Sequence, residues 1–111
     1  MTFPLYFDWA ATAIPDEPVI AEASQVALTY YGNPSSRHKA GAQAREKLEQ
    51  ARSRCAQALH VAPETIVFTS GGTEANQLIL LSLLQRPKAG NILVSSIEHP
   101  AVREQARALA A

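Results

Sequence analysis

The chain has 111 residues, 47% of them hydrophobic, which is the size of one domain with enough apolar residues for a core. Ten basic and ten acidic side chains give a formal net charge of zero, so we expect no general attraction to nucleic acid or to membranes. A single cysteine, no basic leader and no apolar run of ~18 residues argue against an internal disulfide, a signal peptide and a membrane span, so we expect a cytoplasmic protein.

An extended segment, residues 1–15, precedes the first predicted helix. Pro15 and Pro18 bracket two acidic residues, which is typical of a helix start. Apolar residues then recur at spacings of three and four, which predicts a buried face made of Ile20, Ala23, Ala27 and Tyr30. This helix should end at residues 32–34 (GNP), because glycine stops a helix and proline prevents it from restarting.

A second helix is predicted from a cap at Ser35 or Ser36 to about Leu59. Its apolar stripe consists mostly of small residues, so a neighbouring element should pack closely against Ala40, Ala44, Leu48, Ala51, Cys55 and Ala58. Basic side chains outnumber acidic ones along this helix, which indicates a solvated face with ion pairs more than a nucleic-acid site. Cys55 lies on the stripe, where a small buried hydrophobe is favoured over a nucleophile or a ligand.

A predicted strand, a glycine turn and a helix follow one another between residues 65 and 84. Residues 65–69 (TIVFT) are β-branched and aromatic, and residues 77–84 (QLILLSLL) are apolar around most of a helix, which predicts that both are buried. Between them, free N–H groups and the helix dipole favour an anion at Gly71, Gly72 and Thr73. The hydroxyls of Ser70 and Thr73 can cap the helix or donate to phosphate. A phosphate site and a tight turn with a capped helix fit these residues equally well.

The last part of the chain predicts a loop at residues 87–90, a second strand at residues 91–96 and a helix at residues 100–111. Val102, Ala106 and Leu109 share one face of that helix. Strands that alternate with helices indicate an α/β fold with parallel strands. The helix stops at Ala111 without a glycine or asparagine cap, so we expect the chain to be truncated there.

His99 is a second candidate site residue, because it stands at the carboxyl end of the second predicted strand. Ligands of parallel sheets gather at that edge, where the turn at Gly71 also emerges. Pro100 restricts His99 to an extended conformation, and an imidazole suits proton transfer near neutral pH. A helix-capping or packed histidine is the alternative. His38 and His60 stand at helix ends, and no cysteine or histidine spacing predicts a metal site.

Four motifs occur along the chain in a fixed order: residues 7–12 (FDWAAT), 32–36 (GNPSS), 68–76 (FTSGGTEAN) and 96–102 (SIEHPAV). With these motifs, essentially the whole chain resembles the amino-terminal segment of the pyridoxal-phosphate-dependent cysteine desulfurases of the NifS/IscS type, in the class V aminotransferase family. The resemblance implies a type I pyridoxal-phosphate-dependent transferase fold, of which residues 16–111 would be the first part of the large domain, with an incomplete sheet.

By this resemblance, Gly72 and Thr73 would bind the cofactor phosphate, and His99 would stack on the pyridine ring and move protons as a catalytic residue. The family converts L-cysteine to L-alanine and leaves a persulfide on an enzyme cysteine. That sulfur passes to an acceptor or scaffold protein for the assembly of iron–sulfur clusters or other sulfur-containing cofactors. Residues 33–36 would lie near the active site and the contact of a homodimer.

Two departures from the family pattern matter. Trp9 stands where the family usually has a small or polar residue, which concerns the substrate entrance. The family's cofactor-binding lysine, nucleophilic cysteine and substrate-binding arginine would follow residue 111, and neither Cys55 nor any lysine of this chain matches them. We therefore expect this chain alone to be inactive. A non-catalytic fragment or association module, and another enzyme of the same fold such as a selenocysteine lyase, are the alternatives.

The two predicted strands are not neighbours in the fold of that family, where later strands lie between them. An isolated chain would leave both strands with unpaired edges and exposed apolar faces. We expect it to pair non-natively, to associate with another copy or to be marginally stable.

Overall fold

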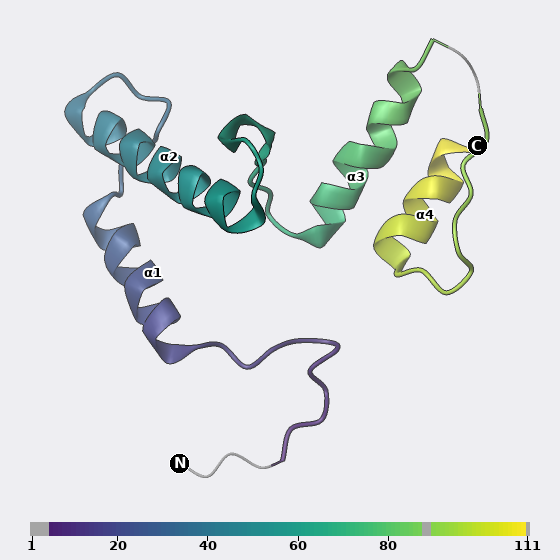
Figure 1. The fold of residues 1–111 in the computed structure, drawn as a ribbon, viewed down its shortest axis with the longest axis horizontal. Coiled ribbons are helices and arrows are strands. Elements are labelled where there is room, and N and C mark those ends of the chain that lie inside the picture. Colours follow the sequence, from purple (N-terminus) through teal and green to yellow (C-terminus); the bar gives the residue numbers. More distant parts are fainter. Residues whose placement is uncertain (1–4, 88–89, 111) are drawn as a thin grey trace. The chain divides into compact units, whose positions relative to one another are not determined.

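A computed structural model describes residues 5–87 and 90–110 of the chain. These residues form four α-helices and two short 3-10 helices joined by irregular segments, and no strand occurs among them (Figure 1). The chain divides into two compact units, Met1–Ile66 and Val67–Ala111. Lys88 in the predicted loop and the predicted end at Ala111 lie outside the described residues. None of the described helices is both long enough and apolar enough to cross a membrane.

Helix α1 spans Glu17–Thr29 and confirms the first predicted helix. Asp16 caps it, because its Oδ1 accepts the N–H of Val19 at 3.1 Å, and proline occupies the first turn. The predicted burial of its apolar face is wrong, since α1 contains no buried residue and Ile20 is 54% exposed. Periodicity identifies which face of a helix is apolar, but it does not supply the element that covers that face.

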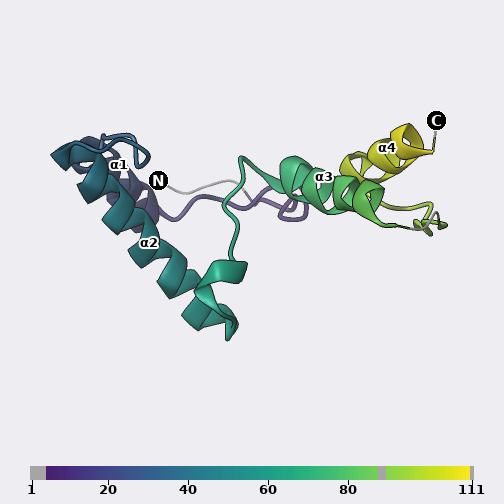
Figure 2. The same ribbon diagram turned by 90° about the horizontal axis from the view of Figure 1, so that it is seen from above.

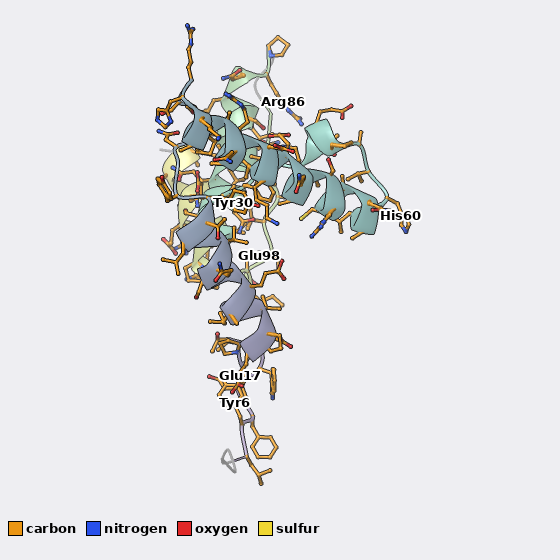
Figure 3. The ribbon with its side chains drawn as sticks, turned by 90° about the vertical axis from the view of Figure 1, so that its left-hand side faces the viewer. Tyr6, Glu17, Tyr30, His60, Arg86 and Glu98 are labelled. Atoms are coloured by element: carbon orange, nitrogen blue, oxygen red, sulfur yellow. The ribbon has the colours of Figure 1, made fainter. Side chains whose placement is uncertain are left out.

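Helix α2 spans Lys39–Leu59, so its predicted end is confirmed. Its predicted cap is wrong, because His38 occupies that position and its Nδ1 accepts the N–H of Gly41 at 3.2 Å. The two serines belong to the preceding turn, where Asn33 Oδ1 accepts the N–H of Ser35 at 2.9 Å. An asparagine turn of this kind satisfies nearby backbone groups and moves the helix start down the chain. The far end of α2 is closed by His60 in a left-handed conformation, with φ of 55° (Figure 3).

The connection between α1 and α2 brings backbone against backbone. A Cβ on Gly32 would lie 2.8 Å from the amide nitrogen of Gly41, and a Cβ on Gly41 would lie 2.7 Å from the carbonyl oxygen of Asn33. Only glycine fits at such approaches. Nearby, the Lys47 ammonium lies 5.6 Å from the centre of the Tyr30 ring, a cation–π contact between α2 and the end of α1.

Burial along α2 differs from the predicted stripe. Its buried residues are Gly41, Ala44 and Ala56, so only Ala44 of the stripe is buried. Cys55 is exposed, which makes its predicted burial wrong. It borders an open groove of about 630 Å³ between α1 and α2. Small side chains on a helix are buried only where a second helix packs close to them. Here a groove separates α1 from α2, so most of the stripe stays uncovered.

The first unit ends in a 3-10 helix, Pro63–Thr65, which takes up the residue where the first strand was predicted to begin. The N–H of Thr65 donates to the carbonyl of Ala62 at 3.0 Å. The guanidinium of Arg52 donates to the carbonyl of Ile66 and also to Glu49, at 3.0 Å. These bonds hold the end of the unit against α2.

In the second unit, α3 (Gly72–Ser82) continues into the 3-10 helix Leu83–Gln85, and α4 spans Pro100–Leu109. Helices α3 and α4 pack side by side and run in the same direction, and residues 90–99 return along the pair (Figures 1 and 2). The prediction of a shared face on the last helix is confirmed, because Val102, Ala106 and Leu109 are all half-buried. The prediction that the helix of residues 77–84 is buried is wrong, because within α3 only Leu80 is buried.

Neither predicted strand forms in the described part of the chain: residues 66–69 and 91–96 carry no strand. A strand is stable only when its N–H and C=O groups pair with a neighbouring strand. The return path between α3 and α4 is the one that a helix–strand–helix unit of a parallel sheet follows (Figure 1). The helices and their path agree with the α/β prediction, while the sheet itself stays a prediction.

Candidate functional site

The candidate site begins at the amino-terminal turn of α3. Gly71 precedes the helix in an extended conformation, with φ of 164° and ψ of −179°, and no side-chain hydrogen bond caps the helix. The alternative in which the hydroxyl of Ser70 or Thr73 caps α3 is therefore wrong. The N–H groups of Gly72 and Thr73 have no hydrogen-bond acceptor in the described part of the chain. Such groups at the positive end of a helix dipole are donors ready for an anion.

The space in front of this turn is open. A Cβ built on Gly71 or Gly72 would meet no atom within 4 Å, and both glycines are exposed. Neither glycine adopts a left-handed backbone conformation, so neither is required for a left-handed turn. The absence of side chains here leaves the amide groups accessible to a ligand.

Glu74 fixes the turn from within the first turn of α3. One carboxylate oxygen, Oε2, accepts the N–H of Ser70 at 2.6 Å and the hydroxyl of Ser70 at 2.7 Å. The backbone N–H of Ser70, and then its hydroxyl, lower the pKa of Glu74 from the ordinary value of 4.5. The Ser70 hydroxyl proton therefore points to Glu74 and is not available to an anion on the turn. Sequence reasoning missed Glu74, because the N-cap position three residues before it holds Gly71 in place of the serine or threonine of a capping box.

His99 is the N-cap residue of α4. Its Nδ1 accepts the N–H of Ala101 at 3.1 Å, with φ of −57° and ψ of 146°. The prediction that Pro100 holds His99 extended is confirmed. The alternative expectation for this histidine, that it caps a helix, is confirmed as well. Its side chain is nonetheless exposed, so the ring remains accessible to a ligand.

A tether joins the two helices of this unit close to the turn. Gln105 on α4 donates from Nε2 to the carbonyl of Thr73 at 3.2 Å. Both helices begin at the same end of the pair (Figure 1). The structure therefore brings Gly72, Thr73 and His99 to one end of the second unit. Sequence reasoning could not find Gln105, because a bond between residues 32 positions apart depends on how the helices pack.

The remaining candidates lie in the first unit. His38 and His60 sit at the two ends of α2, as the sequence predicted. No group of three or more histidine, cysteine, aspartate or glutamate residues in the described ranges could hold a metal ion. The turn at Gly71 and Gly72 and the residue His99 are thus the functional candidates that the second unit places at one end of its helix pair.

The chain is similar in sequence to a known protein family and to several curated proteins. The family model described as "Aminotransferase class-V" matches residues 5–111. "Cysteine desulfurase IscS 1" of Archaeoglobus fulgidus is 42% identical over 106 residues, which cover 94% of this chain and 28% of that protein. "Cysteine desulfurase IscS" of Pseudoalteromonas translucida is 42% identical over 115 residues, covering 98% of this chain and 28% of that protein.

A "Selenocysteine lyase" of Xenopus laevis is 35% identical over 112 residues, which cover 88% of this chain and 26% of that protein. No solved structure matches the chain. The chain thus spans between 26% and 28% of the length of these three curated relatives.

Proposed function

The chain belongs to the aminotransferase class-V family, and we propose that it is the amino-terminal part of a pyridoxal-phosphate-dependent cysteine desulfurase. The family predicted from the four sequence motifs is confirmed by the match over residues 5–111. The proposal for the activity is supported by 42% identity to two cysteine desulfurases over nearly the whole chain. The complete enzyme would convert L-cysteine to L-alanine and leave a persulfide on a cysteine residue of its own.

One observation carries the proposal for the site: the start of α3 offers donors that fit a phosphate group. The N–H groups of Gly72 and Thr73 have no acceptor in the described residues, and no Cβ occupies the space before them. The Thr73 hydroxyl adds a third donor, and the helix dipole favours the negative charge. We propose that Gly72 and Thr73 hold the phosphate of pyridoxal phosphate in the complete enzyme.

The role proposed for His99 rests on its position at the start of α4. The Gln105 tether and the packing of α3 against α4 fix this histidine at the same end of the unit as the phosphate turn. An exposed imidazole ring there can stack on the pyridine ring of the cofactor. When it is bound, pyridoxal phosphate supplies an electron sink for the reaction. His99 is the residue of this chain that we propose as catalytic.

Other parts of the proposal concern the complete enzyme. We propose a cytoplasmic homodimer that passes its sulfur to an acceptor or scaffold protein, with neither nucleic acid nor membrane as a partner. Residues 1–15 would be an amino-terminal extended segment, and residues 16–111 the first part of the large domain. The lysine that binds the cofactor, the sulfur-accepting cysteine and the arginine for the substrate carboxylate would come from outside this chain. This chain alone should therefore release no alanine from L-cysteine.

A chimera tests the proposed function. The aligned segment of the Archaeoglobus fulgidus desulfurase is replaced by this chain, and alanine and persulfide formation from L-cysteine are measured. The relative without that segment, and this chain alone, serve as controls that should both be inactive. An active chimera supports the proposal. A folded chimera that retains no cofactor and forms no alanine contradicts it.

A selenocysteine lyase is the second candidate, because the Xenopus laevis protein is 35% identical over 88% of this chain. The higher identity to the desulfurases favours the first candidate. Rates measured with L-cysteine and with L-selenocysteine, on the complete protein that carries this chain, separate the two. A protein that cleaves L-selenocysteine and is inert to L-cysteine would establish the second candidate in place of the first.

A further inference from the structure

Gln105 is a polar residue on the face of α4 that otherwise carries apolar side chains. Val102, Ala106 and Leu109 share this face, and all four residues are half-buried. A half-buried amide needs a hydrogen-bond partner, because burial removes part of the water that would otherwise satisfy it. The partner of Gln105 is the carbonyl of Thr73, which accepts a hydrogen bond from Nε2 at 3.2 Å. This bond ties α4 to the first turn of α3.

The bond reaches α3 at the open turn. Thr73 carries one of the two N–H groups that have no acceptor in the described residues, and Gly72 carries the other. Packing does not hold these donors in place, because a Cβ on Gly71 or Gly72 would meet no atom within 4 Å. Glycine also loses more conformational freedom on ordering than any other residue. Hydrogen bonds from neighbouring residues must therefore order the turn.

Two side chains hold the turn, one on each side of its glycines. Before the glycines, Glu74 Oε2 accepts the N–H and the hydroxyl of Ser70, at 2.6 and 2.7 Å. After them, Gln105 holds the carbonyl of Thr73. Glu74 and Ser70 are four residues apart, so their bonds shape the turn locally. Gln105 comes from the other helix of the pair, so its bond fixes the turn against α4.

We propose that Gln105 is a positioning residue for the cofactor phosphate. By holding the Thr73 carbonyl against α4, it keeps the N–H groups of Gly72 and Thr73 directed at one place before a phosphate binds. Phosphate binds more tightly to donors that are already ordered, because less conformational entropy is then lost on binding. The inference rests on the proposed phosphate site, and it gives Gln105 no contact with the cofactor.

Gln105→Met tests the positioning in this chain without any cofactor. Methionine is nearly as long as glutamine, favours a helix about equally and has no N–H donor. Gln77→Met, at an exposed glutamine of α3, is the matched control. Nitrogen-15 relaxation should show that the backbone order parameters of Gly72 and Thr73 fall toward the ~0.6 of flexible chain in Gln105→Met alone. Equal order parameters in the two variants would overturn the inference.

The chimera separates a positioning role from a general structural one. Pyridoxal lacks the phosphate of pyridoxal phosphate, so the ratio of the two affinities reports how well the phosphate is held. Gln105→Met should weaken the binding of pyridoxal phosphate about fivefold, the effect of one ordinary hydrogen bond, and leave the binding of pyridoxal unchanged. Equilibrium dialysis measures both ligands. Equal losses for the two ligands would show that Gln105 supports only the fold, and would overturn the inference.

Failure of the proposed function would look different. A parent chimera that binds pyridoxal phosphate no more tightly than pyridoxal would contradict the proposed phosphate site itself. A parent that prefers pyridoxal phosphate, with the same preference in Gln105→Met, would overturn this inference and leave the proposed function standing. Pyridoxal binding also shows that each variant is folded, so a loss of phosphate affinity alone supports the role of Gln105.

Discussion

Two pairs of glycines show how differently the two units use the same residue. In the first unit, Gly32 and Gly41 let backbone segments approach so closely that a Cβ on either would lie within 3.0 Å of backbone atoms. In the second unit, a Cβ on Gly71 or Gly72 would meet nothing within 4 Å. The first pair is needed for the turn into α2, whereas the second pair keeps the start of α3 open. Glycine at a closed position stabilises a fold, and glycine at an open position leaves room for a ligand.

Two capping histidines make a second contrast between the units. His38 and His99 both accept a backbone N–H at a helix start, at 3.2 Å and 3.1 Å. In the second unit, the capping histidine shares its end of the helix pair with the open turn. The same local structure therefore serves stability alone in the first unit and, in our proposal, both stability and cofactor binding in the second. The predictions below test this contrast.

The largest effect is expected for the closed glycines. Gly32→Ala should destabilise the first unit by about 1–3 kcal/mol, because the added methyl group meets backbone that cannot move without strain. Gly72→Ala is the matched control, and in open space at a helix start it should leave stability unchanged or raise it by up to ~1 kcal/mol. Urea unfolding of the two variants measures the difference. Equal losses in both would show that the contrast between the glycine pairs is wrong.

A smaller effect is expected at the phosphate turn. Thr73→Val keeps the shape of the side chain and removes the proposed hydroxyl donor to the cofactor phosphate. In the chimera the affinity for pyridoxal phosphate should fall by at least about tenfold, since a hydrogen bond to a charged group is worth roughly 1.5–3 kcal/mol. Equilibrium dialysis measures it, and Thr65→Val in the first unit is the control. Unchanged affinity in Thr73→Val would remove this residue from the proposed site.

The capping histidines should lose similar stability when truncated. His38→Ala should cost about 1 kcal/mol, comparable to the loss of other N-cap side chains, and His38→Asn should restore most of it. His99→Ala should behave alike in stability, but in the chimera only the His99 variants should also weaken cofactor binding. Urea unfolding and cofactor retention are the two measurements. A His38 variant that weakens cofactor binding as strongly as a His99 variant would contradict the contrast.

The smallest effect is a pH dependence at the turn. Because the folded state lowers the pKa of Glu74, its contribution to stability is complete above the unfolded value of 4.5 and is lost as the pH falls through the lower folded value. Carbon NMR of the Glu74 carboxyl should follow that titration. Ser70→Ala removes the hydroxyl but leaves the backbone N–H, so it should raise the pKa only part of the way to 4.5. An unshifted Glu74 in the parent chain would mean that the turn is not held as described.

Sequence reasoning located the helices because the signals for them are local. Asp16, the prolines and the spacing of Val102, Ala106 and Leu109 act within a turn or two, and the helices at those positions are confirmed. Burial was predicted poorly because it depends on partners elsewhere. Ile20 and Cys55 belong to apolar stripes but are exposed.

The two predicted strands do not form in the described residues for the same physical reason: they depend on partners elsewhere. The β-branched residues of 65–69 favour extended chain, yet a strand requires a paired neighbour, and the described chain provides none. The candidate site was predicted in part: Gly72, Thr73 and His99 were singled out from the sequence, whereas Glu74 and Gln105 emerged only from the geometry of the turn and of the helix pair. A motif identifies residues that face a ligand, and packing identifies those that hold them in place.

Trapping the cofactor in the chimera tests the central claim most directly. The chimera is loaded with pyridoxal phosphate, reduced with borohydride, digested and analysed by mass spectrometry. The account predicts one reduced adduct, on a lysine of the relative's segment. The fraction of the chimera that carries this adduct should be lower in Thr73→Val. An adduct on Lys39, Lys47 or Lys88 of this chain, or a folded chimera with no adduct at all, would contradict it.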